Sequence, residues 1–220
     1  KEVLSPAAIK DIKNPRHTLN LWNGTMESSF FVDGVKTETI TCCHPKMDLL
    51  AFKVKSGLLA QGRLGIKIRF PYGSPDMTAA DWNSDHRHST DIIASGENYV
   101  CLRRTMDNDG YFVKIVWSEG AKLERTGRNS FRINVLPGKD ELEFLCWFSP
   151  DEMNGEIPSF YEVLADSSDY WKSYWNNGGI IDFAGSTDER ARELERRVIL
   201  SLYLMAIQCA GSLPPQETGL

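Results

Sequence analysis

The sequence lacks the features that define several large classes of protein. No apolar run reaches the ~18 residues that a membrane-spanning helix requires. Basic residues are not in excess, because 25 Lys and Arg stand against 30 Asp and Glu, giving a net charge of -5. This balance argues against a general nucleic-acid-binding protein. Nucleophile-elbow, phosphate-binding-loop and dinucleotide-binding motifs are also missing.

Cysteine is scarce, and the number of cysteines is odd. The five cysteines have no C-x-x-C spacing, which argues against a zinc site of the usual kind. An odd count in a chain of this size favours buried free thiols over a disulfide framework, although one bridge stays open. In Cys42-Cys43-His44 a thiol adjoins an imidazole, but neighbours on a strand point to opposite faces, so packing is the better interpretation.

The composition is nevertheless that of a folded domain. The 220 residues are 41% apolar and 25% charged, which suffices for one large domain or one domain with part of a second. The chain starts at Lys1 rather than Met, and its first residues lack the apolar core of a signal peptide. We therefore expect it to be a piece of a longer protein.

Most of the chain, from about residue 20 to 148, has a strand-like pattern. Asp33-Gly34 separates two β-prone runs and predicts a hairpin, and residues 64–70 alternate as a half-buried strand does. A second hairpin is predicted around Asp107–Gly110. Two further strands, Ser130–Leu136 and Glu141–Phe148, follow with Pro137-Gly138 as the turn between them. Closely spaced strands without intervening helices predict an antiparallel β-sandwich.

After Pro150 the period changes to that of helices. Ser159 with Glu162 matches a capping box, and Gly178-Gly179 should end the helix that it starts. Ser186 with Glu189 predicts a second helix that runs to about Ala210. The aromatic stripe of this region could form a sugar platform, but its helical spacing favours packing against the sandwich; its members are Phe160, Trp171, Tyr174 and Trp175.

The second predicted helix is apolar on all sides over Val198–Ala210. A helix of that kind must be buried on all sides. One face of a sandwich covers only part of it, and ten more residues cannot cover the rest. We therefore expect further helices of the same parent chain, or an oligomer partner, to enclose this segment.

A long polar loop, residues 71–89, interrupts the rhythm of the strands and is the main candidate site. An aromatic ring can stack on a sugar while carboxylates and imidazoles bind its hydroxyls. The alternative is a solvated loop pinned by Trp82. On a strand, His86 and His88 would face the same side and could share a metal, but no third ligand is evident, so we assign no metal and no cofactor. The candidate sugar-binding residues are Asp76, Asp81, Trp82, Asp85, His86 and His88.

Several stretches resemble the six-hairpin glycosidase superfamily, and in particular the maltose and trehalose phosphorylase clan. The stretches that carry this resemblance are Leu21–Thr25, Arg63–Gly73, Ala80–Trp82, Ile181–Asp188, Glu195–Arg197 and Ala206–Gly219. The resemblance implies an N-terminal super-β-sandwich, a helical linker and an (α/α)6 barrel that performs the chemistry. The expected fold class is thus mainly β with C-terminal α: an antiparallel super-β-sandwich, a linker helix and the first barrel helix.

The resemblance also implies a division of the chain and of its function. Residues 1–150 would be the sandwich, which is short enough for such a domain to lack its first strands, 151–185 the linker and 186–220 the truncated start of the barrel. The catalytic carboxylates lie on later barrel helices in this superfamily, so no catalytic residue is expected here. Gln216 and Glu217 would enter the active-site side of the barrel and could contact substrate; otherwise they are solvated.

Two functions from different classes remain open. In the first, the chain is the non-catalytic N-terminal part of an enzyme that cleaves glycosidic bonds of an oligo- or polysaccharide by carboxylate acid/base catalysis. In the second, it is a stand-alone module that binds glycan through the loop at Asp76–His88 and has no catalysis. Neither involves nucleic acid or membrane. A polysaccharide substrate would imply a periplasmic or secreted protein.

Overall fold

The computed structural model describes residues 6–153, 155–178 and 180–211. The chain divides into two compact units, Lys1–Asp169 and Tyr170–Leu220. Among the described residues, no helix is long and apolar enough to cross a membrane.

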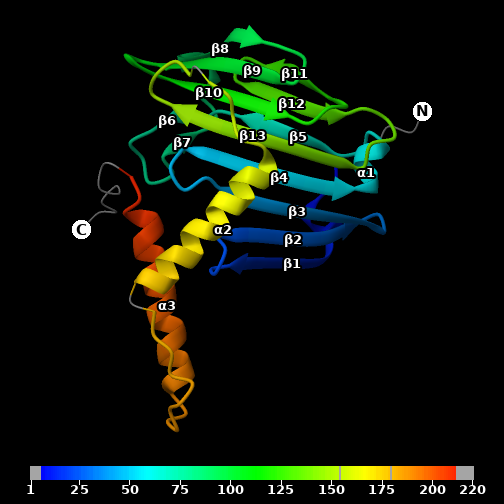
Figure 1. The fold of residues 1–220 in the computed structure, drawn as a ribbon. Helices are drawn as coiled ribbons and strands as arrows, with labels where there is room; N and C mark the ends of the chain where they lie inside the picture. The colour runs from blue at the N-terminus through cyan, green and yellow to red at the C-terminus, as the bar shows by residue number, and fades with distance from the viewer. Residues whose placement is uncertain (1–5, 154, 179, 212–220) are drawn as a thin grey trace. The chain divides into compact units, whose positions relative to one another are not determined.

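An eight-stranded antiparallel sheet forms the larger layer of the first unit (Figure 1). A short 3-10 helix, η1 (Ile9–Asp11), precedes it. In spatial order the strands of this sheet are β1 (Lys13–Asn20), β2 (Thr25–Val32), β3 (Val35–Cys43), β4 (Leu49–Ser56), β13 (Glu141–Ser149), β10 (Asp109–Trp117), β9 (Tyr99–Met106) and β8 (His88–Ser95).

Three-stranded and two-stranded sheets complete the β-structure. The three-stranded sheet has the order β11 (Ala121–Gly127), β12 (Ser130–Val135) and β5 (Gly65–Arg69). The two-stranded sheet pairs β6 (Tyr72–Gly73) with β7 (Ala80–Asp81). Two short helical turns, α1 (Gly57–Ala60) and η2 (Asp85–Arg87), lie in the connections.

The main hydrophobic core lies between the eight-stranded and three-stranded sheets, which makes this unit a β-sandwich. Strands β4, β13, β10 and β9 supply one side of the core, and β11, β12 and β5 supply the other. The buried members include Leu59, Val100, Leu102, Val113, Ile115, Phe131, Ile133 and Leu142. The predicted fold class, mainly antiparallel β with C-terminal helices, is confirmed.

The opposite face of the large sheet is covered in part by helix α2 (Phe160–Asn177), drawn in yellow in Figure 1. Phe160 and Val163 of this helix pack against Leu49, Ala51 and Leu145. The predicted packing of Phe160 against the sandwich is therefore confirmed.

The helix begins where the capping box placed it. The backbone N–H of Ser159 donates to Oε2 of Glu162 at 2.7 Å, and the N–H of Glu162 donates to Oγ of Ser159 at 3.3 Å. These reciprocal bonds satisfy backbone donors that a helix start leaves without partners. Helix α2 ends at Asn177, directly before the predicted Gly178 stop.

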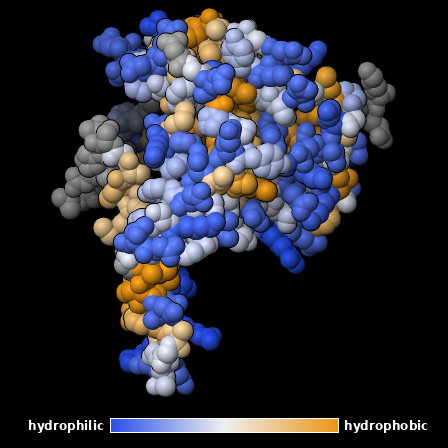
Figure 2. Space-filling model, viewed as in Figure 1, coloured by the Kyte–Doolittle hydropathy of each residue, from blue (hydrophilic) through white to orange (hydrophobic). Residues whose placement is uncertain are grey.

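The second unit contains the rest of α2 and helix α3 (Ala191–Gln208). The ring centroids of Trp171 and Tyr203 lie 5.1 Å apart, and the hydroxyl of Tyr174 donates to the carbonyl of Leu202 at 3.1 Å. No residue of α3 is buried. Figure 2 shows hydrophobic residues over part of α3.

The predicted start of α3 is wrong. The helix begins at Ala191, and its N-cap residue, Arg190, makes no side-chain cap bond. Asp188 takes the role expected of Ser186: its Oδ1 accepts from the N–H of Arg190 at 2.9 Å, and its carbonyl accepts from that of Ala191 at 3.0 Å. An Asp side chain thus closes the turn before the helix, ahead of the Ser-x-x-Glu pattern.

The predicted turns show two successes and one difference. Asp33 and Gly34 have φ values of 50° and 74° and join β2 to β3 as a two-residue turn, as predicted. Pro137 and Gly138 form the predicted turn between β12 and β13, although these two strands belong to different sheets. The turn before β10 is shorter than Asp107–Gly110, because Asp109 already pairs with Met106.

Candidate functional site

The candidate loop, residues 71–89, contains regular secondary structure and internal hydrogen bonds. Its first part folds back on itself as β6 and β7, with Tyr72 opposite Asp81. The N–H of Ser74 donates to the carbonyl of Ala79 at 3.0 Å within the turn. The 3-10 turn η2 follows, and β8 begins at His88 inside the region expected to be loop.

The candidate residues differ in how far they reach solvent. Asp76, Trp82 and His86 are exposed, Asp81 and Asp85 are half-buried, and His88 is buried. His86 lies in η2 whereas His88 starts a strand, so the strand geometry required for a shared metal is not present. Within the described residues, no three His, Cys, Asp or Glu side chains converge in a way that could hold a metal ion.

Trp82 is the exposed aromatic of this loop, with 45% of its surface open. The guanidinium of Arg69 lies 4.9 Å from its ring centroid, and Nη2 of Arg69 donates to its carbonyl at 2.6 Å. A cation held over an indole fixes the ring plane. Trp82 is therefore exposed and held at the same time, as a sugar-stacking residue must be.

The carboxylate of Asp81 serves the loop itself. Its Oδ1 accepts from the N–H of Asn83 at 2.8 Å and from that of Ser84 at 3.2 Å. Hydrogen bonds from Ser84, and then from Asn83, hold the pKa of Asp81 below its usual value. A carboxylate that is ionised and engaged in a turn can accept from a sugar hydroxyl through its remaining lone pairs, but it is a poor proton donor.

A buried arginine, Arg104 of β9, anchors both ends of the loop from below. It is fully buried, at 0% exposure. Its Nη2 donates to the carbonyl of Pro71 at 3.3 Å, where the loop starts. Its Nη1 donates to the carbonyl of Ser89 at 2.9 Å, where the loop ends.

The remaining contacts of this guanidinium explain how the fold tolerates a buried cation. Nη1 also donates to Oγ1 of Thr90 at 2.6 Å and to Oδ1 of Asn129 at 3.0 Å, and Nε donates to the hydroxyl of Tyr111 at 3.4 Å. The ring of Phe70 lies 4.9 Å from the guanidinium carbon. Burying an arginine is costly unless its donors find acceptors, and here neutral oxygens supply most of them.

His88 takes part in the same network rather than in an open binding edge. Nη2 of Arg104 lies 2.8 Å from Nδ1 of His88. Arginine can only donate, so Nδ1 must accept and the ring must be neutral with its proton on Nε2. Burial, and then the charge of Arg104, lowers the pKa of His88. The role of His88 that this geometry supports is structural: its ring contacts the arginine that binds both ends of the loop.

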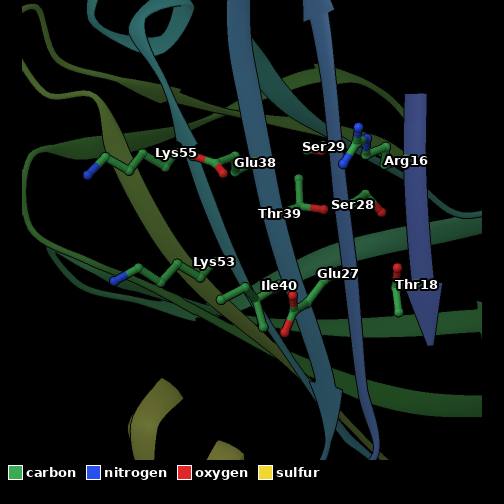
Figure 3. A pocket seen from close by; sticks show the side chains of 10 residues that line it. All are labelled: Arg16, Thr18, Glu27, Ser28, Ser29, Glu38, Thr39, Ile40, Lys53 and Lys55. Carbon is green, nitrogen blue, oxygen red and sulfur yellow. The ribbon is translucent and has the colours of Figure 1, made fainter. Parts of the chain in front are cut away.

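A concave region that the sequence analysis did not predict lies on the face of β1 to β4 (Figure 3). Its volume is about 420 Å³. Its lining residues are Arg16, Thr18, Glu27, Ser28, Ser29, Glu38, Thr39, Ile40, Lys53 and Lys55. Only the strand register could have revealed it, because the register sets Arg16, Ser29, Glu38 and Lys55 in one cross-strand row.

Two of the charged residues that line this hollow, Glu38 and Lys53, form ion pairs with neighbours. Nζ of Lys53 lies 2.6 Å from Glu141 and 3.0 Å from Glu143, and it donates to the hydroxyl of Tyr161 at 2.5 Å. Although burial acts in the opposite direction, hydrogen bonds led by that to Glu141 raise the pKa of Lys53. Lys53 of β4 therefore stays charged at neutral pH, and its ion pairs and hydrogen bond link β4 to β13 and α2.

The cysteines are all free, as predicted, but only Cys42 and Cys146 are buried. Burial raises the pKa of Cys42 to about 11 and that of Cys146 to about 12. Cys43 points to the opposite, exposed side. Desolvation and the charge of Asp48 raise its pKa, so it is not an activated thiolate.

The other predicted contacts, Gln216 and Glu217, lie outside the described residues. On α3, the predicted pair of Glu193 with Arg197 is present at 2.8 Å, and Arg196 contacts the same carboxylate at 2.8 Å. Hydrogen bonds from Arg196, and then from Arg197, lower the pKa of Glu193 to about 2. This cluster is an exposed helix face and not a candidate acid.

Comparison with known proteins defines the class of the fold. No protein-family model matches the chain, and no curated protein matches its sequence. Among solved structures it is similar to one assigned as a kojibiose phosphorylase from the human microbiome, with a TM-score of 0.54 and 10% identity over 88% of this chain and 28% of that one. It is also similar to a bacterial glucoamylase complexed with acarbose, with a TM-score of 0.55 and 13% identity over 91% of this chain and 32% of that one.

These likenesses establish the fold. The resemblance to six-hairpin glycosidases that the sequence indicated is confirmed at that level. The chain spans less than a third of the length of either protein, 28% and 32%.

Proposed function

We propose that this chain is the N-terminal, non-catalytic part of a carbohydrate-active enzyme that cleaves glycosidic bonds with a pair of carboxylates located outside it. The observation that carries the proposal is helix α3. Its second half, Val198–Gln208, is strongly apolar, yet none of its residues is buried. Leu200, Leu204 and Met205 are 37%, 45% and 65% exposed.

Exposure of this kind has a measurable cost. Fully burying a Leu, Ile or Met side chain contributes about 1.5–3 kcal/mol, so covering the open parts of this helix would contribute on the order of 5 kcal/mol. That is a large share of the stability of an ordinary domain. We infer that paired helices of the same parent chain, the remainder of an (α/α)6 barrel, cover α3.

The proposed division of the chain follows from this role. Residues 1–150 form the sandwich, 151–185 the linker and 186–220 the start of the barrel. The fold shared with a phosphorylase and a glucoamylase supports a glycosidic bond as the target. A glycosidase needs two carboxyl groups at a defined separation across that bond. Such a pair would come from the barrel, and Gln216 and Glu217 would contact substrate near it.

Activity of two proteins from the same gene tests the proposal. The 220-residue chain and the longer product of its reading frame are assayed for sugar release, with and without phosphate, on panels of α- and β-linked oligosaccharides. We expect turnover by the longer protein alone. Turnover by the 220-residue chain, or a reading frame that adds no helical pairs after Leu220, would refute the proposal.

A glycan-binding role for the loop at Asp76–His88 is the second candidate, favoured by the fixed and exposed ring of Trp82. In this role Trp82 stacks on a sugar while Asp76, Asp85 and His86 bind hydroxyls. Trp82→Ala should then abolish retention of the chain on a glycan array. Trp22→Ala is the matched control, because Trp22 is 46% exposed in a different turn.

The location of the protein follows from the proposed substrate. An enzyme that degrades polysaccharide meets it outside the cytoplasm, so we propose a periplasmic or secreted protein. Fractionation of the source cells with an antibody against the sandwich tests this; recovery with cytoplasmic markers would contradict it.

A further inference from the structure

The three-stranded sheet has one face in the core and one face outside. Ile66, Ile68, Phe131 and Ile133 point into the core. Because successive side chains of a strand alternate, the residues between them point outward. The outward residues are Lys67 and Arg69 of β5, Ser130, Arg132 and Asn134 of β12, and Lys122 and Glu124 of β11.

This outer face concentrates positive charge on an acidic chain. It carries four exposed cations, Lys67, Arg69, Lys122 and Arg132, and one carboxylate, Glu124, whereas the whole chain has a net charge of -5. None of the four cations forms an ion pair with a described residue of the chain. Glu124 lies directly opposite Arg132 in the β11–β12 ladder and offsets part of this charge, which leaves the face with three more cations than carboxylates.

The register makes the concentration of charge unfavourable for the free protein. Lys67 lies directly opposite Arg132 in the β5–β12 ladder. Like charges in directly opposed positions destabilise an antiparallel pair, and Glu124, on the other side of Arg132, offsets this effect only for Arg132. An anion that binds between Lys67 and Arg132 would relieve the repulsion.

The same residues surround a hollow of about 410 Å³. Its lining comprises Gly65, Lys67, Thr126, Ser130 and Arg132. Gly65 lets neighbouring side chains lie close above the strand, because a Cβ at this position would lie 2.8 Å from Nε of Arg132 and 2.9 Å from Oδ1 of Asn134. The hydroxyls of Thr126 and Ser130, 3.3 Å apart, add neutral hydrogen-bonding groups beside the two cations.

The basic face continues to the aromatic ring of the candidate loop. Arg69 lies two residues from Lys67 on β5 and contacts Trp82 through both its guanidinium and its Nη2–H. Cations, hydroxyls and an exposed indole thus follow one another across one surface. Arginine binds carboxylates in a bidentate manner, hydroxyls bind sugar hydroxyls, and an indole stacks on a sugar ring.

We propose that the outer face of β5, β12 and β11 binds a uronate-containing oligosaccharide. Arg132 and Lys67 would bind a sugar carboxylate, and Arg69 and Trp82 would contact the next residues of the glycan. The inference rests on the proposed carbohydrate function and narrows it to an acidic glycan. A nucleic acid fits less well, because the face offers a single aromatic ring rather than a series on which bases could stack.

Calorimetry with two ligands that differ only in charge tests the proposal. The probes are oligogalacturonate and its fully methyl-esterified form, titrated into the 220-residue chain. We expect at least tenfold tighter binding of the free acid, with an affinity that falls as salt rises. The Lys67→Gln/Arg132→Gln double variant should lose at least tenfold in affinity for the acid.

The control variant is Lys46→Gln/Arg103→Gln, which removes one exposed cation from the β3–β4 connection and one from β9, and it should change affinity by less than twofold. Equal binding of the ester and the acid, equal loss in the control variant, or equal affinity for a sulfated glycan or single-stranded DNA would overturn the inference. So would no binding of any probe. None of these outcomes affects sugar release by the longer protein. Sugar release is therefore a separate test of the proposed function.

Discussion

Nη2 of Arg104 lies 2.8 Å from Nδ1 of His88, and both side chains are buried beneath the candidate loop. Since the guanidinium can only donate, a proton on Nδ1 would break this bond and would place two positive charges in contact. The neutral state of His88 is therefore part of the fold. The charge of Asp85, with Oδ1 3.8 Å from Nε2, opposes this preference but does not reverse it.

The first prediction concerns stability at mildly acidic pH. An unfolded His titrates near pH 6.5, and the pKa of His88 is lower in the folded protein. Above about pH 6.5 both states are neutral at this residue, so it adds no pH dependence. As the pH falls below that value, the unfolded state binds a proton that the folded state does not. Stability should then fall by up to about 1.4 kcal/mol per pH unit until the folded pKa is reached.

Urea unfolding of wild-type, His88→Gln and His86→Gln chains between pH 7.5 and 5 measures this slope. His88→Gln should remove the part of the slope that begins near pH 6.5, whatever its effect on stability at neutral pH. His86→Gln changes an exposed imidazole of the same loop and should retain that part. Identical slopes in all three chains would show that His88 is not the titrating group.

The second prediction concerns Arg104 itself. Arg104→Met would leave the carbonyls of Pro71 and Ser89 without their donor, as well as the side chains of Thr90 and Asn129. Each buried acceptor left without a donor costs about 1–3 kcal/mol, so we expect Arg104→Met to lower the free energy of unfolding by at least about 3 kcal/mol. Arg103→Met, at the next, exposed position, should change the free energy of unfolding by less than about 0.5 kcal/mol. Denaturation followed by circular dichroism compares the two.

The loop should respond to the same substitution. Because Arg104 binds both ends of residues 71–89, its loss should free the ring of Trp82, which acrylamide quenching of fluorescence would detect in comparison with Trp82→Ala. Unchanged quenching in Arg104→Met would separate the guanidinium from the loop and would leave only a packing role for it.

Much of the sandwich could be predicted from local sequence patterns. The predictions that failed did so for physical reasons. The Asp33-Gly34 turn and the 64–70 strand were predicted because positive φ and alternation leave strong signals. Strand β1 was not predicted, because all of its residues are exposed and no alternation results. The pairing of β13 with β4 rather than β12 is a long-range property that no local turn reveals.

The position of the candidate site was predicted, but the contacts that support it were not. The loop and the exposure of Trp82 follow from composition, but the support by Arg104 does not, since Arg103-Arg104 reads as an ordinary surface pair. The outer face of β5 and β12 was missed for the same reason. Lys67 and Arg132 stand far apart in sequence and become neighbours only through the register.

The third prediction compares two serines that the sequence does not distinguish. Both precede a Glu by three residues, but only Ser159 caps a helix, whereas Oγ of Ser186 accepts from the N–H of Asp188 at 3.2 Å. Ser159→Ala should lower the free energy of unfolding by about 1 kcal/mol. Ser186→Ala should change it by less than about 0.5 kcal/mol. A reversed order in thermal denaturation would contradict the observed start of α3.

The last prediction uses the exposed apolar side of α3 to separate the chain from its parent. Leu204 is 45% exposed, so Leu204→Gln should change the stability of the 220-residue chain by less than about 0.5 kcal/mol. If paired helices cover this position in the longer protein, the same substitution buries an amide there and should cost about 2–4 kcal/mol. Arg192→Gln, on the charged first turns of the helix, should be neutral in both proteins.

Thermal denaturation of the six proteins, together with sugar release by the three longer ones, decides the matter. A large loss for Leu204→Gln in the longer protein alone means that the parent covers the helix. A large loss already in the 220-residue chain means that α3 is covered within this chain, and the need for a barrel disappears. No loss in either means that the apolar surface stays open to solvent, and the proposal that this chain begins a barrel fails on its central observation.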